Sequence, residues 1–99
     1  LRQARAKIVQ ERSRVGGPLE EKVKKVEATI ERLENESDEV SAALEAASVA
    51  GDGGAIAKHS RRSEQLRQEI DAAFDKLETA TKAFEDATRE FDKRLQELG

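Results

Sequence analysis

The chain has 99 residues, of which 39% are charged and 36% hydrophobic, and its formal net charge is −3. Leu, Ile, Val and Phe together contribute only 21 residues, so the apolar volume is too small for a thick core and we expect one domain at most. No apolar run approaches the roughly 20 residues that a membrane-spanning helix needs, which excludes a transmembrane helix.

Ala, Glu, Lys, Leu and Arg account for 56 of the 99 residues, a composition typical of coiled coils and long helices. The chain has no Cys, which excludes disulfides and thiolate chemistry and favours an intracellular protein. No charged and then apolar leader opens the sequence, so we predict no signal peptide. Because the chain contains no Met and starts with Leu1, we expect a single domain excised from a longer protein.

Residues 1–15 are predicted to form a basic helical arm that ends at a break over residues 16–18. The break has the sequence Gly-Gly-Pro, and both Gly and Pro interrupt a helical pattern. We expect the apolar residues of the arm to cover the end of the last helix, and these are Ile8, Val9 and Val15. The alternative is that residues 1–14 fray.

Residues 19–49 are predicted to form the first helix of a coiled coil. Apolar and small residues recur there at alternating steps of four and three, which indicates a helix with one narrow seam. The seam consists of Leu19, Val23, Val26, Ile30, Leu33, Ser37, Val40, Leu44 and Ala47. A glycine-rich turn is predicted to follow over residues 50–54.

Residues 55–98 are predicted to form the second helix, with a seam of the same spacing. This seam consists of Ile70, Phe74, Leu77, Thr81, Phe84, Thr88, Phe91, Leu95 and Leu98. Toward the turn the seam is weaker and continues through Ile56, Ser60 and Ser63, with Leu66 beside it.

The short connection between the two helices favours antiparallel neighbours. In the register that this turn dictates, Leu33 faces Ile70, and extending the register points Phe91 at Arg12. We therefore predict an all-α fold, an antiparallel two-helix coiled-coil hairpin with an additional short N-terminal helical arm, and we expect a monomer. A parallel homodimer is the alternative, which the mass in solution distinguishes.

Known catalytic and cofactor motifs do not fit the sequence. The segment 51–58 has Ile56 where a phosphate loop needs Gly before its Lys, and 51–56 lacks the third Gly of a dinucleotide fingerprint. His59 is the only histidine and has no other metal ligand at a suitable spacing. The many carboxylates are expected to lie on solvated helix faces. We therefore predict no catalytic residue, no metal site and no cofactor in this domain, which is not an enzyme by itself.

The charges are distributed unevenly along the chain. The net charge is +5 over residues 1–25, −7 over 26–56, +3 over 57–68 and −4 over 69–99. Two basic patches result, and each has the chemistry to neutralise phosphates without reading sequence. Their members are Lys58, Arg61, Arg62 and Arg67 near the turn, and Arg2, Arg5, Lys7, Arg12, Arg14, Lys22, Lys24 and Lys25 near the chain ends. The alternative is that these residues only keep a coiled coil solvated.

Three stretches carry a resemblance to a known family. They are Pro-Leu-Glu-Glu-Lys-Val at residues 18–23, Ala-Ala-Ser-Val-Ala-Gly-Asp-Gly at 46–53 and Ile-Asp-Ala-Ala-Phe-Asp-Lys-Leu-Glu at 70–78, with Glu27, Ile30, Leu33 and Glu34 between the first two. With these residues the chain resembles the C-terminal coiled-coil domain of ABC-F ATPases, the Uup-like group. The similarity covers most of residues 15–98.

The resemblance implies a non-catalytic appendage of a cytoplasmic ATPase that binds nucleic acid, DNA in Uup-like members, while the family at large acts on ribosomes. It also implies that ATP and magnesium bind only to parent cassettes absent from this chain. The expected partners are therefore DNA or ribosomal RNA and the parent cassettes, with no membrane. The alternative function is a structural or protein-interaction coiled coil that acts as a spacer or regulator of the parent ATPase.

Overall fold

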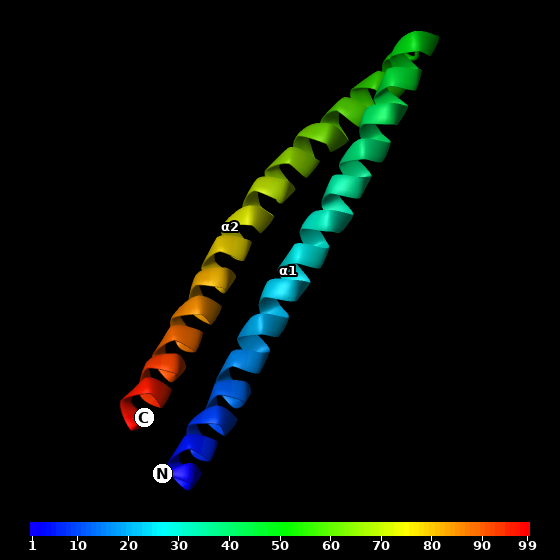
Figure 1. The fold of residues 1–99 in the computed structure, drawn as a ribbon. Coiled ribbons are helices and arrows are strands. Elements are labelled where there is room, and N and C mark those ends of the chain that lie inside the picture. Colours follow the sequence, from blue (N-terminus) through cyan, green and yellow to red (C-terminus); the bar gives the residue numbers. More distant parts are fainter. The chain divides into compact units, whose positions relative to one another are not determined.

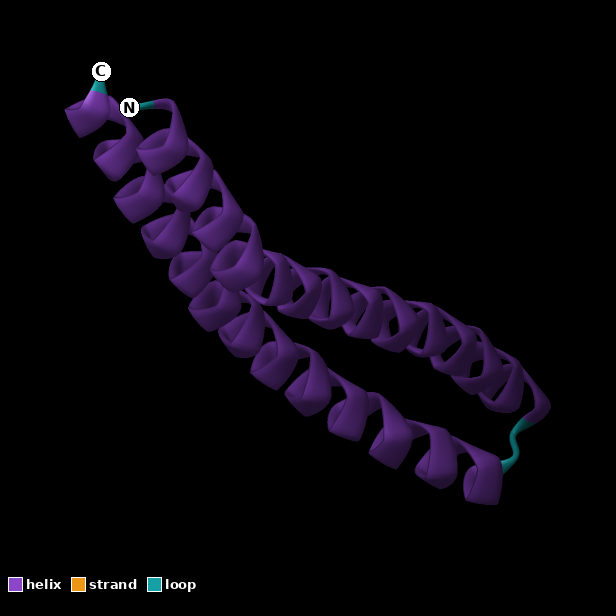
Figure 2. Ribbon diagram, turned by 90° about the horizontal axis from the view of Figure 1, so that it is seen from below, coloured by secondary structure: helices purple, strands orange, loops and turns teal.

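The computed structural model describes all 99 residues and consists of two helices. Helix α1 spans Arg2–Ala50 and helix α2 spans Gly53–Leu98, with no strand (Figures 1 and 2). The chain divides into two compact units, which we call the terminal unit (residues 1–26 and 76–99) and the turn unit (residues 27–75). Within each unit a segment of α1 runs antiparallel beside a segment of α2. The predicted all-α antiparallel hairpin is confirmed.

The turn is shorter than the predicted 50–54, because Asp52 takes part both in ending α1 and in starting α2. Gly51 has a φ of 69° and donates to the Ser48 carbonyl at 3.2 Å, and the Asp52 N–H donates to the Ala47 carbonyl at 3.0 Å. This pair of bonds is the Schellman motif that ends many helices. The Asp52 carboxylate then accepts from the Ala55 N–H at 3.1 Å, as an N-cap does. The predicted helices 19–49 and 55–98 were therefore too short at the turn.

The predicted break over residues 16–18 is wrong, because α1 continues through Pro18 without interruption. Besides the hydrogen bond that it removes, a proline inside a helix clashes with the Cβ of the residue before it, and Gly17, which has no Cβ, removes this part of the cost. The N-terminal part of α1 also packs against α2, with Ile8 buried and Arg12 bonded to Asp92 at 3.1 Å. The 1–15 arm is therefore the start of α1 and neither a separate helix nor a frayed end.

Two neighbouring glycines in α1 give a first testable prediction. Apart from the adjacent residues of the chain, a Cβ placed on either Gly16 or Gly17 meets nothing within 4 Å, so no residue packed against α1 excludes Ala at these sites. We expect Gly16→Ala to raise the free energy of unfolding by about 0.5–1 kcal/mol, the helix-propensity difference. Gly17→Ala should gain clearly less, because its Cβ meets the ring of Pro18. Urea denaturation followed by circular dichroism measures both, and equal gains would contradict our explanation of the uninterrupted helix.

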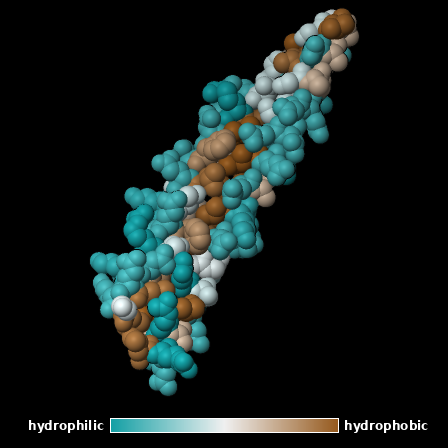
Figure 3. Space-filling view, viewed as in Figure 1, coloured by the Kyte–Doolittle hydropathy of each residue, from teal (hydrophilic) through white to brown (hydrophobic).

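The seam of α1 is confirmed, since every predicted seam residue is buried or half-buried. The seam of α2 is partly wrong. Phe74 is 47% exposed and Ser60 is also exposed, while Leu66 is fully buried and Ala73 is 6% exposed. Steps of three and four through Ile70 and Leu77 fit residues 73 and 74 equally, and side-chain size alone favours Phe74. On the face drawn in Figure 3, apolar atoms accordingly gather in a narrow band between hydrophilic flanks.

Candidate nucleic-acid interface

The terminal unit carries most of the predicted phosphate-binding cations. Five of them lie on α1, are exposed and have no ion-pair partner within the chain: Arg2, Arg5, Lys7, Arg14 and Lys22. Lys7 and Arg14 are two helical turns apart on one face of α1, and Lys22 follows eight residues later, about 80° around the helix. At 1.5 Å per residue these three cations span about 22 Å along one helix.

Other predicted cations of the terminal unit are neutralised by carboxylates. Arg12 bonds Asp92 across the two helices, and Lys24 lies 3.4 Å from Glu20 one turn earlier on α1. Lys25 is exposed. The structure thus separates the predicted basic patch near the chain ends into cations that are paired and cations that are available to an external anion.

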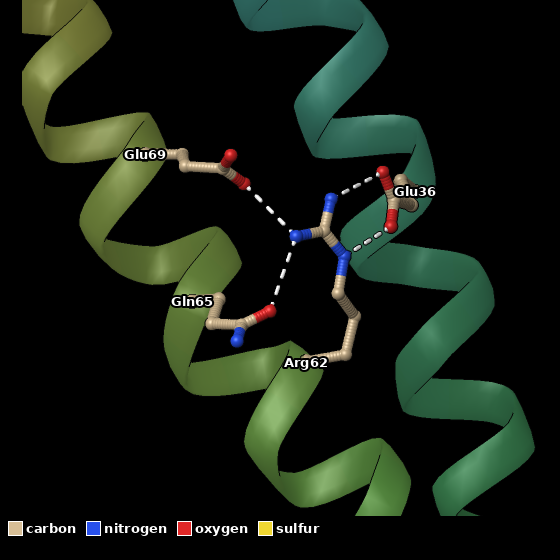
Figure 4. Close-up of polar contacts among 4 residues, drawn as sticks. All are labelled: Glu36, Arg62, Gln65 and Glu69. Carbon is tan, nitrogen blue, oxygen red and sulfur yellow. Dashed lines mark hydrogen bonds and ion pairs between the residues drawn. The ribbon is translucent and has the colours of Figure 1, made fainter.

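In the turn unit, Arg62 is held by carboxylates from both helices (Figure 4). Its Nε and Nη2 atoms donate to the two oxygens of Glu36 on α1 at 2.6 and 2.9 Å, which is a bidentate pair. Its Nη1 atom lies 3.2 Å from Glu69 and donates to Gln65 at 3.4 Å, both on α2. Arg62 therefore links α1 to α2, and its charge is not available to phosphates.

The same contacts shift the pKa values of the groups involved. The hydrogen bond from Arg62 lowers the pKa of Glu36 below its ordinary value, and the reciprocal bond raises the pKa of Arg62. The hydrogen bond from Arg67 likewise lowers the pKa of Glu64. The shifts favour the charged form of all four groups, so none of these pairs is lost by a change of protonation at neutral pH.

The patch near the turn is thereby reduced to two available cations. Arg67 is occupied by Glu64 at 2.6 Å and lies 3.7 Å from Asp71. Lys58 and Arg61 are exposed and have no ion-pair partner within the chain. Arg62 lies near Lys58 and Arg61 along α2, but it adds no available charge to this patch because its guanidinium is already paired.

The terminal unit also has three exposed, unpaired cations on α2 that the sequence did not single out, namely Lys76, Lys82 and Lys93. Lys93 of α2 is exposed and unpaired, whereas its neighbour Arg94 bonds Glu11 at 3.2 Å and lies 5.3 Å from the centre of the Phe91 ring. The net negative charge of residues 69–99 concealed Lys93. The register that points Phe91 at Arg12 was the signal that would have placed it beside the basic part of α1.

No group of three or more His, Cys, Asp or Glu side chains is arranged to hold a metal ion. Neither helix has an apolar stretch long enough to span a membrane. His59 is half-buried on α2 near the turn.

Comparison with known proteins identifies the family. The pattern of the ABC transporter C-terminal domain matches residues 19–82, which include the whole turn unit and more than half of the chain. Neither the curated proteins nor the solved structures give a match. Four of the five available cations on α1 lie before the matched segment, and only Lys22 lies inside it. The match confirms the resemblance seen in the sequence, and the chain belongs to the ABC transporter C-terminal domain family.

Proposed function

We propose that this domain is a non-catalytic nucleic-acid-binding appendage of a cytoplasmic ABC-F type ATPase. The observation that supports the proposal is the set of five exposed cations on α1 of the terminal unit that no carboxylate of the chain neutralises. DNA is the favoured ligand, and ribosomal RNA offers the same phosphate chemistry. ATP and magnesium would bind to cassettes of the parent protein, as the resemblance to ABC-F ATPases implies.

Binding would rest on phosphate charge alone. Each Lys or Arg that neutralises a phosphate releases condensed counterions, which favours binding most at low salt. Stacking of bases has no support in the terminal unit, where Phe91 is buried and Phe84 half-buried. We therefore expect affinity without sequence preference.

A pair of charge-matched triple variants tests the proposal. The first variant carries Lys7→Gln, Arg14→Gln and Lys22→Gln, which removes three available cations. We expect it to bind duplex DNA at least about tenfold more weakly at low salt and to lower the salt dependence, the slope of log affinity against log salt, by about one per lost contact. Fluorescence anisotropy with labelled duplexes at several salt concentrations measures both quantities.

The control variant removes three cations that are already paired within their own helix, through Lys24→Gln, Arg67→Gln and Arg89→Gln. It changes the net charge by the same amount and should bind nearly as well as the unmodified chain. Equal losses in the two variants would show that only net charge matters, and an unmodified chain that does not bind at low salt would refute the proposal. Lys58→Gln with Arg61→Gln tests the turn unit without breaking the Arg62 pair.

A protein-interaction role is the second candidate. It is favoured by a groove on the terminal unit that no residue of the chain fills.

A further inference from the structure

In the terminal unit, the buried side chain of Ile8 separates two flanks of α1. Successive residues of a helix are turned by about 100°, so Lys7 and Val9 lie on opposite sides of Ile8. Val9 borders the groove of this unit, which has a volume of about 440 Å³. Lys7 therefore lies on the flank away from the groove, and Arg14, two turns later, lies on that flank too. We call Lys7 and Arg14 the basic row.

The buried ring of Phe91 separates two flanks of α2 in the same way. Its neighbours Glu90 and Asp92 lie on opposite sides of it, about 100° to either side. Glu97 is two turns from Glu90 and lies on the same flank, whereas Glu85 is two turns from Asp92 and lies on the other. We call Glu97 and Glu90 the acidic row.

One ion pair shows that the two rows lie on the same side of the terminal unit. Glu11 is four residues after the first member of the basic row and three before the second, so it shares their flank of α1. Arg94 lies between the two members of the acidic row with the same spacing and shares their flank of α2. Since Glu11 and Arg94 are 3.2 Å apart, the two flanks face each other across this pair.

The members of the two rows also lie at matching levels along the unit. The Arg12–Asp92 pair shows which residues of the two antiparallel helices are level. Counted from it, Lys7 is level with Glu97, and the other two members are level as well. All four side chains are exposed, and none forms an ion pair within the chain.

The two rows are close enough to act on the same ligand. Packed helices lie about 8–10 Å apart, which does not exceed the screening length of about 10 Å at 0.1 M salt. A phosphate that is attracted by the basic row is therefore also repelled by the acidic row.

Lys22 lies outside this arrangement. It is level with residue 82 of α2, about 12 Å along the helix from the level of Glu90. Two turns from Glu90 toward the turn, the flank of the acidic row carries Ala83 in place of a carboxylate. The repulsion from α2 therefore fades between Arg14 and Lys22.

We propose that the acidic row limits the affinity of the basic row for nucleic acid and keeps the ligand on α1. This inference rests on the proposed function and concerns the regulation of the same cations. The ligand follows α1 because the opposite flank of α2 repels phosphate, and its contact is closest near Lys22, where that repulsion is weakest.

Removal of the two charges of the acidic row tests the inference. The variant with Glu90→Gln and Glu97→Gln loses two exposed carboxylates that make no ion pair, so circular dichroism should show intact helices. We expect it to bind duplex DNA about threefold to tenfold more tightly than the unmodified chain at low salt. The gain should shrink as salt screens the repulsion. Fluorescence anisotropy with labelled duplexes measures both.

The matched control is Glu78→Gln with Glu85→Gln. Both residues are exposed, unpaired carboxylates of α2 in the same unit, and they have the same seven-residue spacing. They lie on the flank of Asp92, away from the basic row. The control changes the net charge equally and should give a clearly smaller gain. The gain from removing the acidic row should also be lost when Lys7→Gln and Arg14→Gln are present, because the ligand is then no longer held beside it.

The outcomes separate this inference from the proposed function. Equal gains in the two double variants would show that only net charge matters and would overturn the role of the acidic row. An unmodified chain that binds, with a variant that binds no more tightly, would overturn the inference and leave the proposed function standing. Binding that appears only after removal of the acidic row would support the repulsion and refute the proposed function of the unmodified chain. Absence of binding in both chains at low salt would overturn both.

Discussion

Replacing Leu66 by Ala is expected to lower the free energy of unfolding by about 2–3 kcal/mol, because the change empties a fully buried site. Leu66 is the only side chain of the molecule that is fully buried, and it lies in the turn unit. Its removal leaves a cavity that a pair of helices has little freedom to close. A loss of this size is a large part of the stability of a domain of about 100 residues.

Phe74→Ala is the matched comparison, eight residues further along the same helix and in the same unit. The Phe side chain is larger than Leu, yet about half of it already faces solvent. We therefore expect a loss of less than about 1 kcal/mol. Urea denaturation monitored at the helical circular dichroism band measures both variants. A loss at Phe74 as large as that at Leu66 would show that Phe74 occupies the seam after all.

Gly51→Ala is expected to lower the free energy of unfolding by about 1–2 kcal/mol, the second large effect. The φ of 69° at Gly51 lies in the left-handed region, where a Cβ crowds the following carbonyl. No atom outside the adjacent residues lies within 4 Å of the position that the Cβ would take, so the loss comes from the local backbone conformation alone.

Gly53→Ala provides the control for this prediction. Gly53 is the first residue of α2 and also has room for a Cβ, but its φ is not positive. Because Ala restricts the unfolded chain more than Gly, this variant should gain about 0.5 kcal/mol. Thermal or urea unfolding of the two variants should therefore give changes of opposite sign. A gain at both positions would contradict the Schellman ending of α1.

The helical hairpin was predictable because its evidence is local and repeated. The α1 seam from Leu19 to Ala47 uses one spacing over four heptads, and the glycines around Asp52 mark the only turn. The spacing allowed either Ala73 or Phe74 to be the seam residue, and side-chain size favoured Phe74. The structure buries Ala73 instead, because closely packed helices accept Ala in the seam. The predicted break at Gly-Gly-Pro was wrong for a related reason. Gly and Pro were each taken as helix breakers by themselves, although Gly17 has no Cβ to clash with the ring of Pro18.

The sequence shows which basic residues make up the candidate interface, but it does not show which of them are left without an ion-pair partner. Counting Lys and Arg located both basic patches. Whether a given cation is neutralised depends on which carboxylates the packed helices bring within reach, as Arg62 and Glu36 show from 26 residues apart. Such cross-helix pairs depend on which residues of the two helices lie side by side and on the side-chain conformations. The spacing of residues along the sequence reveals neither.

The terminal unit contains both ends of the chain, because α1 starts there and α2 finishes there. Tension applied between residues 1 and 99 would therefore peel the two helices apart, beginning in the terminal unit, and would not slide one along the other. Peeling breaks one layer of side chains at a time, beginning with contacts such as Glu11 with Arg94, so the resistance at any moment is that of a single layer. The domain should yield to small forces step by step, and it should close again from the turn when the load is released.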